Sequence, residues 1–195
     1  PGGERMASFG ERILGAVRLD AATYEEVEAD TTALGQALAV VVLASVSAGL
    51  GSSLAAGNQG VGLLGGVLFN LAGWFVWAFL TYLVGTRILP TPETEADVGQ
   101  LLRTTGFSAA PGMLGILGAI PAIGGLVLFV AWLWQLAAMV VAVRQALDYT
   151  STGRAIGVCL IGFVAYLLIA TVLAGILMGG LMAVGGGPRP AGAMP

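Results

Sequence analysis

The sequence predicts an all-α protein that crosses a membrane several times. Of its 195 residues, 57% are hydrophobic and 10% are charged, whereas an ordinary soluble domain carries about 25% charged residues. The charges are gathered in a few short stretches, which leaves residues 31–86, 104–143 and 155–188 without any formal charge. Because a helix needs about 20 apolar residues to cross the hydrocarbon core, these stretches are expected to hold the membrane-spanning segments.

The N-terminal segment, residues 1–30, is polar and is expected to lie on the membrane surface. Apolar residues recur in it at helical spacing, with charged residues on the opposite face, which indicates a short amphipathic helix. The apolar set is Phe9, Ile13, Leu14 and Val17, and the charged set is Glu11, Arg12 and Arg18. Asp20 is then expected to cap a second, acidic helix over residues 21–29.

A bundle of five transmembrane helices is predicted in a domain that covers residues 31–184. The expected spans are residues 33–57, 62–86, 107–122, 125–146 and 155–183. The sequence Asn58-Gln59-Gly60 is typical of a turn and separates the first two spans. A Gly- and Pro-rich tail, residues 185–195, follows the last one.

The third predicted span is short. Between Phe107 and Pro121 there is room for only about 21 Å of α-helix, while the hydrocarbon core is about 30 Å thick. Pro111 is tolerated in the first turn of a helix, and Pro121 stops it. The segment is therefore expected to span incompletely or to thin the bilayer, and a re-entrant hairpin is the alternative.

The placement of arginine predicts the orientation. All eight basic residues are Arg, and with five crossings seven of them fall on the same side as the N-terminus. Only Arg189 falls on the other side. Since positive residues are retained on the cytoplasmic side of a membrane, the N-terminus is expected in the cytoplasm and the C-terminus outside.

Composition excludes several kinds of chemistry. The chain has no His and no Lys, which excludes a histidine base or metal ligand, a Schiff-base lysine and a Walker-type phosphate loop. The single cysteine, Cys159, has no partner in the chain for a disulfide. The spans also lack paired carboxylates and metal-ligand clusters, so we expect no catalytic residue, metal, cofactor or nucleic-acid partner.

Two amides, Asn70 and Gln135, are expected inside the membrane at similar depths, about 12 Å and about 15 Å from the same side. An amide in hydrocarbon needs a hydrogen-bonding partner. One interpretation is an interhelical hydrogen bond that fixes packing, which is worth roughly 0.6–2 kcal/mol. The other interpretation is the polar lining of a pathway. Packing is the favoured interpretation because such bonds are common between membrane helices.

Candidate contact residues lie at the ends of the predicted spans, on the side expected to face the cytoplasm. They are Arg87, Arg103, Arg144, Asp148 and Arg154. A guanidinium at this interface can reach lipid phosphates or pair with an acid. Arg144 and Asp148 are four residues apart and are expected to pair, which leaves Arg103 or Arg154 freer for anionic head groups or an acidic partner. The plainer interpretation is that these arginines set only the topology.

Five sequence strings, spread over most of the membrane domain, are informative when taken together. They are LDAATYEEVEAD (19–30), GQALAVV (35–41), LVGTRI (83–88), QLLRTTGFSAAPGMLGIL (100–117) and VAVRQALDYTSTGRAI (141–156). This set resembles the bacterial branch of the Yip family, the Ypt/Rab-interacting membrane proteins. The resemblance implies a five-helix membrane domain with a cytoplasmic N-terminus. Eukaryotic relatives bind prenylated small GTPases, but their acidic-Tyr-Gly-Pro motif has no counterpart here, so GTPase binding is not implied.

The expected function is that of a non-enzymatic scaffold or accessory subunit in the bacterial inner membrane. Its expected partners are membrane lipids, anionic ones included, and other membrane proteins or a second copy of the chain. The alternative is a small-solute transporter or channel subunit in which Asn70 and Gln135 line a polar path. Transporters usually carry ionisable residues within the membrane or paired broken helices, and neither is evident in the sequence.

Overall fold

The computed structural model describes residues 6–55 and 63–185. Within these residues every regular element is helical, which confirms the all-α class. Four helices are long and apolar enough to cross a membrane, at Thr31–Ala55, Leu63–Ile88, Gly124–Ala146 and Thr152–Ile176. The predicted turn at Asn58-Gln59-Gly60 and the predicted tail beyond residue 185 lie outside the described residues.

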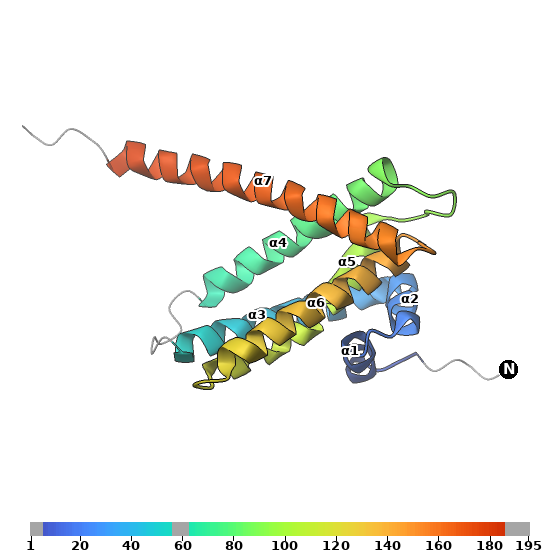
Figure 1. Cartoon of the computed structure of the whole chain (residues 1–195), viewed down its shortest axis with the longest axis horizontal. Helices are drawn as coiled ribbons and strands as arrows, with labels where there is room; N and C mark the ends of the chain where they lie inside the picture. The colour runs from blue at the N-terminus through green and yellow to red at the C-terminus, as the bar shows by residue number, and fades with distance from the viewer. Residues whose placement is uncertain (1–5, 56–62, 186–195) are drawn as a thin grey trace, which may run out of the picture.

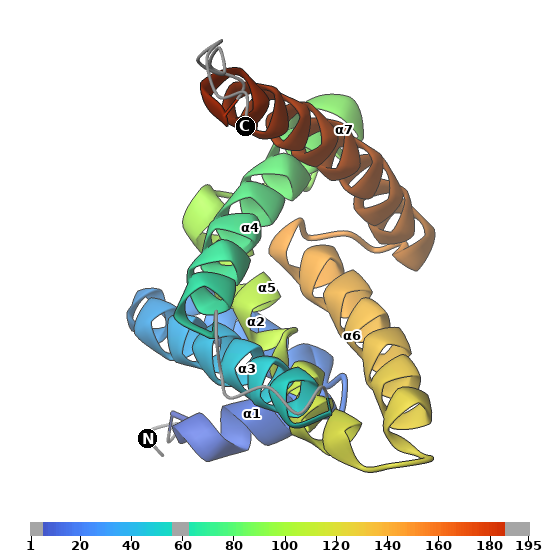
Figure 2. The same ribbon diagram turned by 90° about the vertical axis from the view of Figure 1, so that its left-hand side faces the viewer.

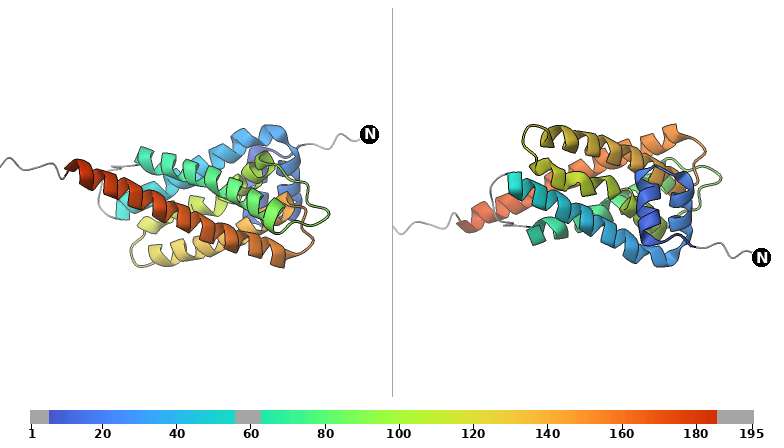
Figure 3. Two further views of the ribbon diagram at one scale, coloured as in Figure 1. Left: turned by 90° about the horizontal axis from the view of Figure 1, so that it is seen from above. Right: turned by 90° about the horizontal axis from the view of Figure 1, so that it is seen from below.

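Two short helices, α1 (Phe9–Val17) and α2 (Ala21–Ala29), form a cap across one end of the bundle (Figure 3). At the start of α1, Ser8 and Glu11 close a reciprocal capping box. Asp20 caps α2, as predicted, by accepting a hydrogen bond from the Ala22 amide at 3.3 Å. We use "the cap" below for these two helices.

The long helices run in both directions relative to the cap (Figure 1). After the 3₁₀ turn η1 (Thr31–Ala33), α3 (Leu34–Ala55) runs away from the cap, and α4 (Leu63–Leu83) returns and ends in the π-helical turn η2 (Val84–Ile88). Helix α6 (Gly124–Ala146) also returns to the cap end, and α7 (Thr152–Gly185) departs from it. These four helices match predicted spans one, two, four and five to within a few residues.

The third predicted span takes a different form. The segment begins earlier, as α5 (Val98–Phe107), and continues as the 3₁₀ helix η3 (Ala110–Ala119) rather than as one short α-helix. Neither piece is long enough to count among the four candidate spans. Ten residues of 3₁₀ helix rise about 20 Å, and η3 packs between α3 and α6. Five membrane crossings therefore remain a prediction.

Glycine brings η3 into direct backbone contact with α3. Gly112, Gly115 and Gly118 are spaced by three residues, which is the period of a 3₁₀ helix. A Cβ atom added at Gly115 would lie 2.7 Å from the Cα of Ala48, and one added at Gly51 would lie 2.1 Å from the Gly115 carbonyl oxygen. No side chain fits at Gly51 or Gly115, so this contact fixes η3 against α3.

The buried core lies at the cap end of the molecule. Its largest fully buried side chains include Arg12, Tyr24, Leu101, Phe107 and Leu147, from the cap, α5 and the end of α6. Helices α4 and α7 instead expose large apolar side chains, as expected of surfaces that face lipid. Helix α7 also leaves the bundle at an angle and crosses α4 (Figure 2).

Candidate functional site

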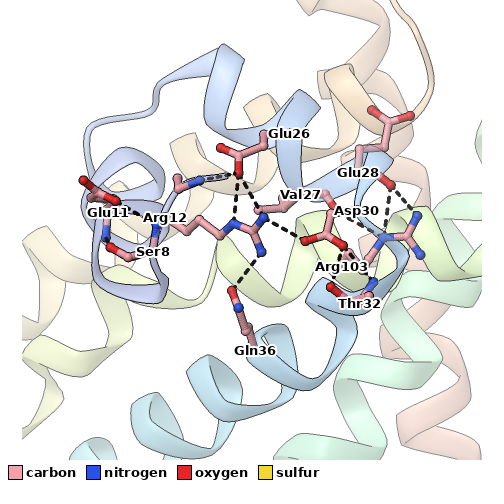
Figure 4. Close-up of polar contacts among 11 residues, drawn as sticks. Ser8, Glu11, Arg12, Glu26, Val27, Glu28, Asp30, Thr32, Gln36 and Arg103 are labelled. Atoms are coloured by element: carbon pink, nitrogen blue, oxygen red, sulfur yellow. Dashed lines mark hydrogen bonds and ion pairs between the residues drawn. The ribbon is translucent and has the colours of Figure 1, made fainter. Parts of the chain in front are cut away.

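Arg12 lies at the centre of a buried polar cluster between the cap and the start of α3 (Figure 4). Only 1% of its side chain is exposed. Its guanidinium donates to the carboxylates of Glu26 at 2.9 Å and Asp30 at 2.7 Å, and to the amide oxygen of Gln36 at 3.0 Å. The prediction that Arg12 lies on the outer, polar face of the first helix is therefore wrong. The second helix folds back over the first, and its acids enclose the guanidinium.

Two carboxylates at the end of the cap have opposite electrostatic surroundings. Hydrogen bonds from Thr32 and Arg12 hold the pKa of Asp30 below its usual range. Burial, together with the nearby Asp148 carboxylate, raises the pKa of Glu28 to about 7. The side chain of Glu28 also accepts a hydrogen bond from the Gln100 amide at 3.1 Å, which ties the cap to α5.

Arg103, on α5, is buried beneath the last turn of α2 (Figure 4). Its Nε donates to the carbonyl oxygens of Val27 at 3.0 Å and Glu28 at 3.1 Å, and its Nη2 donates to the Glu28 carbonyl as well. The last carbonyls of a helix have no partners within that helix, and a cation satisfies them. Arg103 is 6% exposed, so it is not one of the freer arginines.

The predicted ion pair between Arg144 and Asp148 does not form. Arg144 instead donates to the carbonyl oxygens of Tyr149 at 3.0 Å and Thr150 at 3.3 Å. The spacing of four residues brings side chains together only while the helix continues. Helix α6 ends at Ala146, and Asp148 takes a left-handed backbone conformation with φ of 52°, so its side chain leaves the face that carries Arg144.

Arg87 and Arg154 are the exposed arginines of the predicted contact set, and Asp148 is exposed as well. Arg154, at the start of α7, donates to the Pro90 carbonyl at 3.1 Å. This contact places it beside the chain that leaves η2, where Arg87 lies. In the part of the chain that the structure describes, the ion pairs belong to Arg12 alone. We call Arg87 and Arg154 the arginine corner.

Asn70 and Gln135 line one cavity of about 290 Å³ between the long helices. The other polar or aromatic side chains in its wall are Ser45, Phe69, Trp74, Trp77, Thr105 and Tyr166. The two amides thus share a polar space, but no hydrogen bond joins them among the described contacts. Asn70 donates to the Gly66 carbonyl on its own helix at 2.9 Å, so a bond between the two amides does not fix the packing of α4 and α6.

Sequence reasoning missed Tyr166, the polar residue that α7 contributes to the cavity. The available signal was a lone tyrosine halfway along an otherwise apolar span. It also missed Arg12 as a buried residue, because its partners come from a neighbouring helix. Over residues 6–55 and 63–185, no group of three or more metal-ligating side chains comes together.

Comparison with known proteins gives one match. A family model described as the Yip1 domain matches residues 17–187. Searches of curated proteins and of solved structures gave no match. The matched stretch runs from the end of α1 into α7 and beyond, so it includes Arg103, the arginine corner and the cavity.

Proposed function

The chain belongs to the Yip1 family and is a multi-pass membrane protein, and from this premise we propose that it is a non-enzymatic scaffold or accessory subunit. It organises membrane lipids or partner proteins at the end of the bundle that carries the cap. We assign it to the bacterial branch of the family and to the bacterial inner membrane, in line with the strings near Arg103 and Arg154 and with a composition that contains arginine but no lysine.

The observation that supports this proposal most directly is the arginine corner. Arg12, Arg103 and Arg144 are engaged with carboxylates or carbonyls of the chain itself. Arg87 and Arg154 are exposed at helix ends, with no carboxylate of the described chain in ion-pair contact, and the contact of Arg154 with the Pro90 carbonyl leaves that side chain exposed. An interfacial arginine attracts anionic lipid by about 1 kcal/mol, so the corner offers anionic head groups, or an acidic partner, two exposed arginines on segments that touch through the contact of Arg154 with Pro90.

The test is purification in mild detergent followed by identification of the lipids and proteins that stay bound. The variant Arg87→Gln with Arg154→Gln is expected to lose most of its anionic lipid and any acidic partner. Arg18→Gln is the matched control, since it removes a positive charge from an exposed position between the two helices of the cap. Unchanged retention in a folded double variant would leave the corner arginines as topology signals only.

For the orientation we propose a cytoplasmic N-terminus, five crossings and an outside C-terminus. In support, Arg87, Arg103, Arg144 and Arg154 all lie toward the cap end of the long helices, which fits retention of positive charge on one side. Reporter fusions at Asn58 and at Pro195 are expected to report the outside. A cytoplasmic signal from the C-terminal fusion would contradict the five crossings, including the one assigned to α5 and η3.

A second candidate function is that of a small-solute transporter or channel subunit. The specific observation in its favour is that Asn70 and Gln135 line the same cavity. A transporter or channel subunit is expected to take up a small polar solute into proteoliposomes that carry the protein. The variant Asn70→Leu with Gln135→Leu would abolish that uptake, whereas a scaffold supports no uptake in either form.

A further inference from the structure

Two polar side chains face the cavity without a partner among the residues that the structure describes. They are the Gln135 amide, halfway along α6, and the Tyr166 hydroxyl, halfway along α7. Every fully buried side-chain nitrogen or oxygen in the described chain does have a partner. Both of these unpaired groups border empty space, and in a membrane such groups need a bound partner.

Tyr166 is held in place where it reaches from α7 toward α4. Its ring meets Trp77 edge-on, with the ring centres 6.3 Å apart, and the Trp77 indole nitrogen donates to the Met139 sulfur at 3.1 Å. Gly73 leaves room for the hydroxyl, because a Cβ atom there would lie 3.0 Å from it. The hydroxyl is therefore positioned by packing and remains available for a hydrogen bond.

An apolar groove of about 440 Å³ lies beside the cavity, between α4 and α7. Phe69, Gly73 and Tyr166 belong to the walls of both spaces, so the polar cavity meets the groove at Tyr166. The rest of the groove is lined by aliphatic residues such as Val76, Ala170 and others of α4 and α7. The two spaces together have a polar compartment and an apolar extension, which is the shape of a site for an amphiphile.

The polar compartment selects for an uncharged head group. Its wall contains amides, hydroxyls and indoles but no Arg, Asp or Glu. A phosphate there would lack a countercharge within the membrane, which is strongly unfavourable. Gln135 can both donate and accept a hydrogen bond, Tyr166 can do the same, and Asn70 retains its carbonyl oxygen as an acceptor. This set suits a ligand with one hydroxyl and at least one carbonyl.

We infer that this site binds a membrane lipid of the acylglycerol class. Its hydroxyl and ester groups contact Gln135 and Tyr166, and an acyl chain occupies the groove between α4 and α7. The site is separate from the arginine corner, so the inference goes beyond the proposed function and does not depend on it.

The experiment measures lipid binding to the purified full-length protein by native mass spectrometry. The probes are dioleoylglycerol, dioleoylphosphatidylglycerol and dioleoylphosphatidylcholine. The variant Gln135→Leu with Tyr166→Phe removes both unpaired polar groups with only a small loss of side-chain volume, so dioleoylglycerol is expected to bind at least tenfold more weakly. Tyr82→Phe is the matched control, because it removes a tyrosine hydroxyl on α4 outside the cavity.

A second variant tests the groove without touching the polar groups. Ala170→Phe places a ring in the groove and is expected to weaken dioleoylglycerol binding by a similar factor, while the arginine corner variant leaves it unchanged. Equal dioleoylglycerol binding by wild-type protein and both cavity variants would overturn the inference. So would binding of the two phospholipids that matches dioleoylglycerol and is lost in the same variants.

Discussion

The cap and the cavity both contain polar side chains, but those in the cap have hydrogen-bonding partners within the chain and two of those in the cavity do not. In the cap, Arg12 is surrounded by Glu26, Asp30 and Gln36, and Arg103 closes the end of α2. In the cavity, Gln135 and the Tyr166 hydroxyl face open space. The cap therefore carries the signature of a structural cluster and the cavity that of a binding site.

The contrast between satisfied and unsatisfied polar groups also divides the arginines into buried and exposed ones. Burial makes Arg12 and Arg103 part of the fold, whereas exposure leaves Arg87 and Arg154 available to ligands. Arginines that appear equivalent in the sequence thus have two roles. Substitutions in the cap are expected to change stability, and substitutions at the corner are expected to change binding.

The largest effect is expected from Arg12→Met. The substitution keeps most of the side-chain volume but leaves the Glu26 and Asp30 carboxylates, which are 34% and 9% exposed, without their cation. Removing one partner of a buried ion pair costs about 3–5 kcal/mol, and the exposure of Glu26 favours the lower end. Thermal unfolding in detergent measures the loss. Arg18→Met is the control and should shift stability by no more than about 0.5 kcal/mol.

A smaller loss is expected from Gly115→Ala, at the contact between η3 and α3. The new Cβ atom would lie 2.7 Å from the Cα of Ala48, so two backbones must separate. Overpacking of this kind costs about 1–3 kcal/mol. Gly65→Ala on α4 is the matched control, since nothing lies within 4 Å of its added Cβ. Equal stability of the two variants would mean that η3 does not lie against α3 as described.

The smallest effect concerns pH and Glu28. Its pKa is about 7 in the folded protein against 4.5 for an unperturbed glutamate. The folded state therefore keeps the Glu28 carboxyl protonated to higher pH than the unfolded chain does. The free energy of unfolding is thus highest below pH 4.5, where Glu28 is neutral in both states, and it falls as the pH rises through 7. Solvent screening at this half-buried group limits the change to about 1 kcal/mol. Unfolding temperatures of wild type and Glu28→Gln measured across this range should converge at low pH; a parallel pair of curves would contradict the assignment.

Local signals predicted the local structure well. The amphipathic spacing from Phe9 to Val17 predicted α1, Asp20 predicted the start of α2, and long charge-free runs predicted four of the long helices. The glycine spacing of three in 110–119 matches the 3₁₀ period of η3. By itself the spacing indicates close packing and does not distinguish a 3₁₀ helix from a chance pattern, because the chain contains 31 glycines.

Contacts between distant segments were not predictable in the same way. The sequence places Arg12 on the charged face of the first helix. Its burial depends on the Glu26 and Asp30 carboxylates, which α2 and the residue after it bring across that helix. The pairing of Arg144 with Asp148 failed because the helix ends between them. Asn70 and Gln135, which the sequence places at similar depth, line one cavity, but the contribution of Tyr166 from α7 depends on how that helix crosses α4.

The contrast between buried and exposed arginines is tested most directly by native mass spectrometry of bound phosphatidylglycerol per folded chain. The measurement compares Arg12→Met with the double variant Arg87→Gln and Arg154→Gln, each below its unfolding temperature. We expect the Arg12 variant to retain wild-type lipid despite its lower stability. We expect the corner variant to lose at least tenfold in lipid affinity at wild-type stability, in line with about 1 kcal/mol per arginine. A corner variant that keeps its lipid, or a cap variant that loses it while folded, would contradict the division of roles.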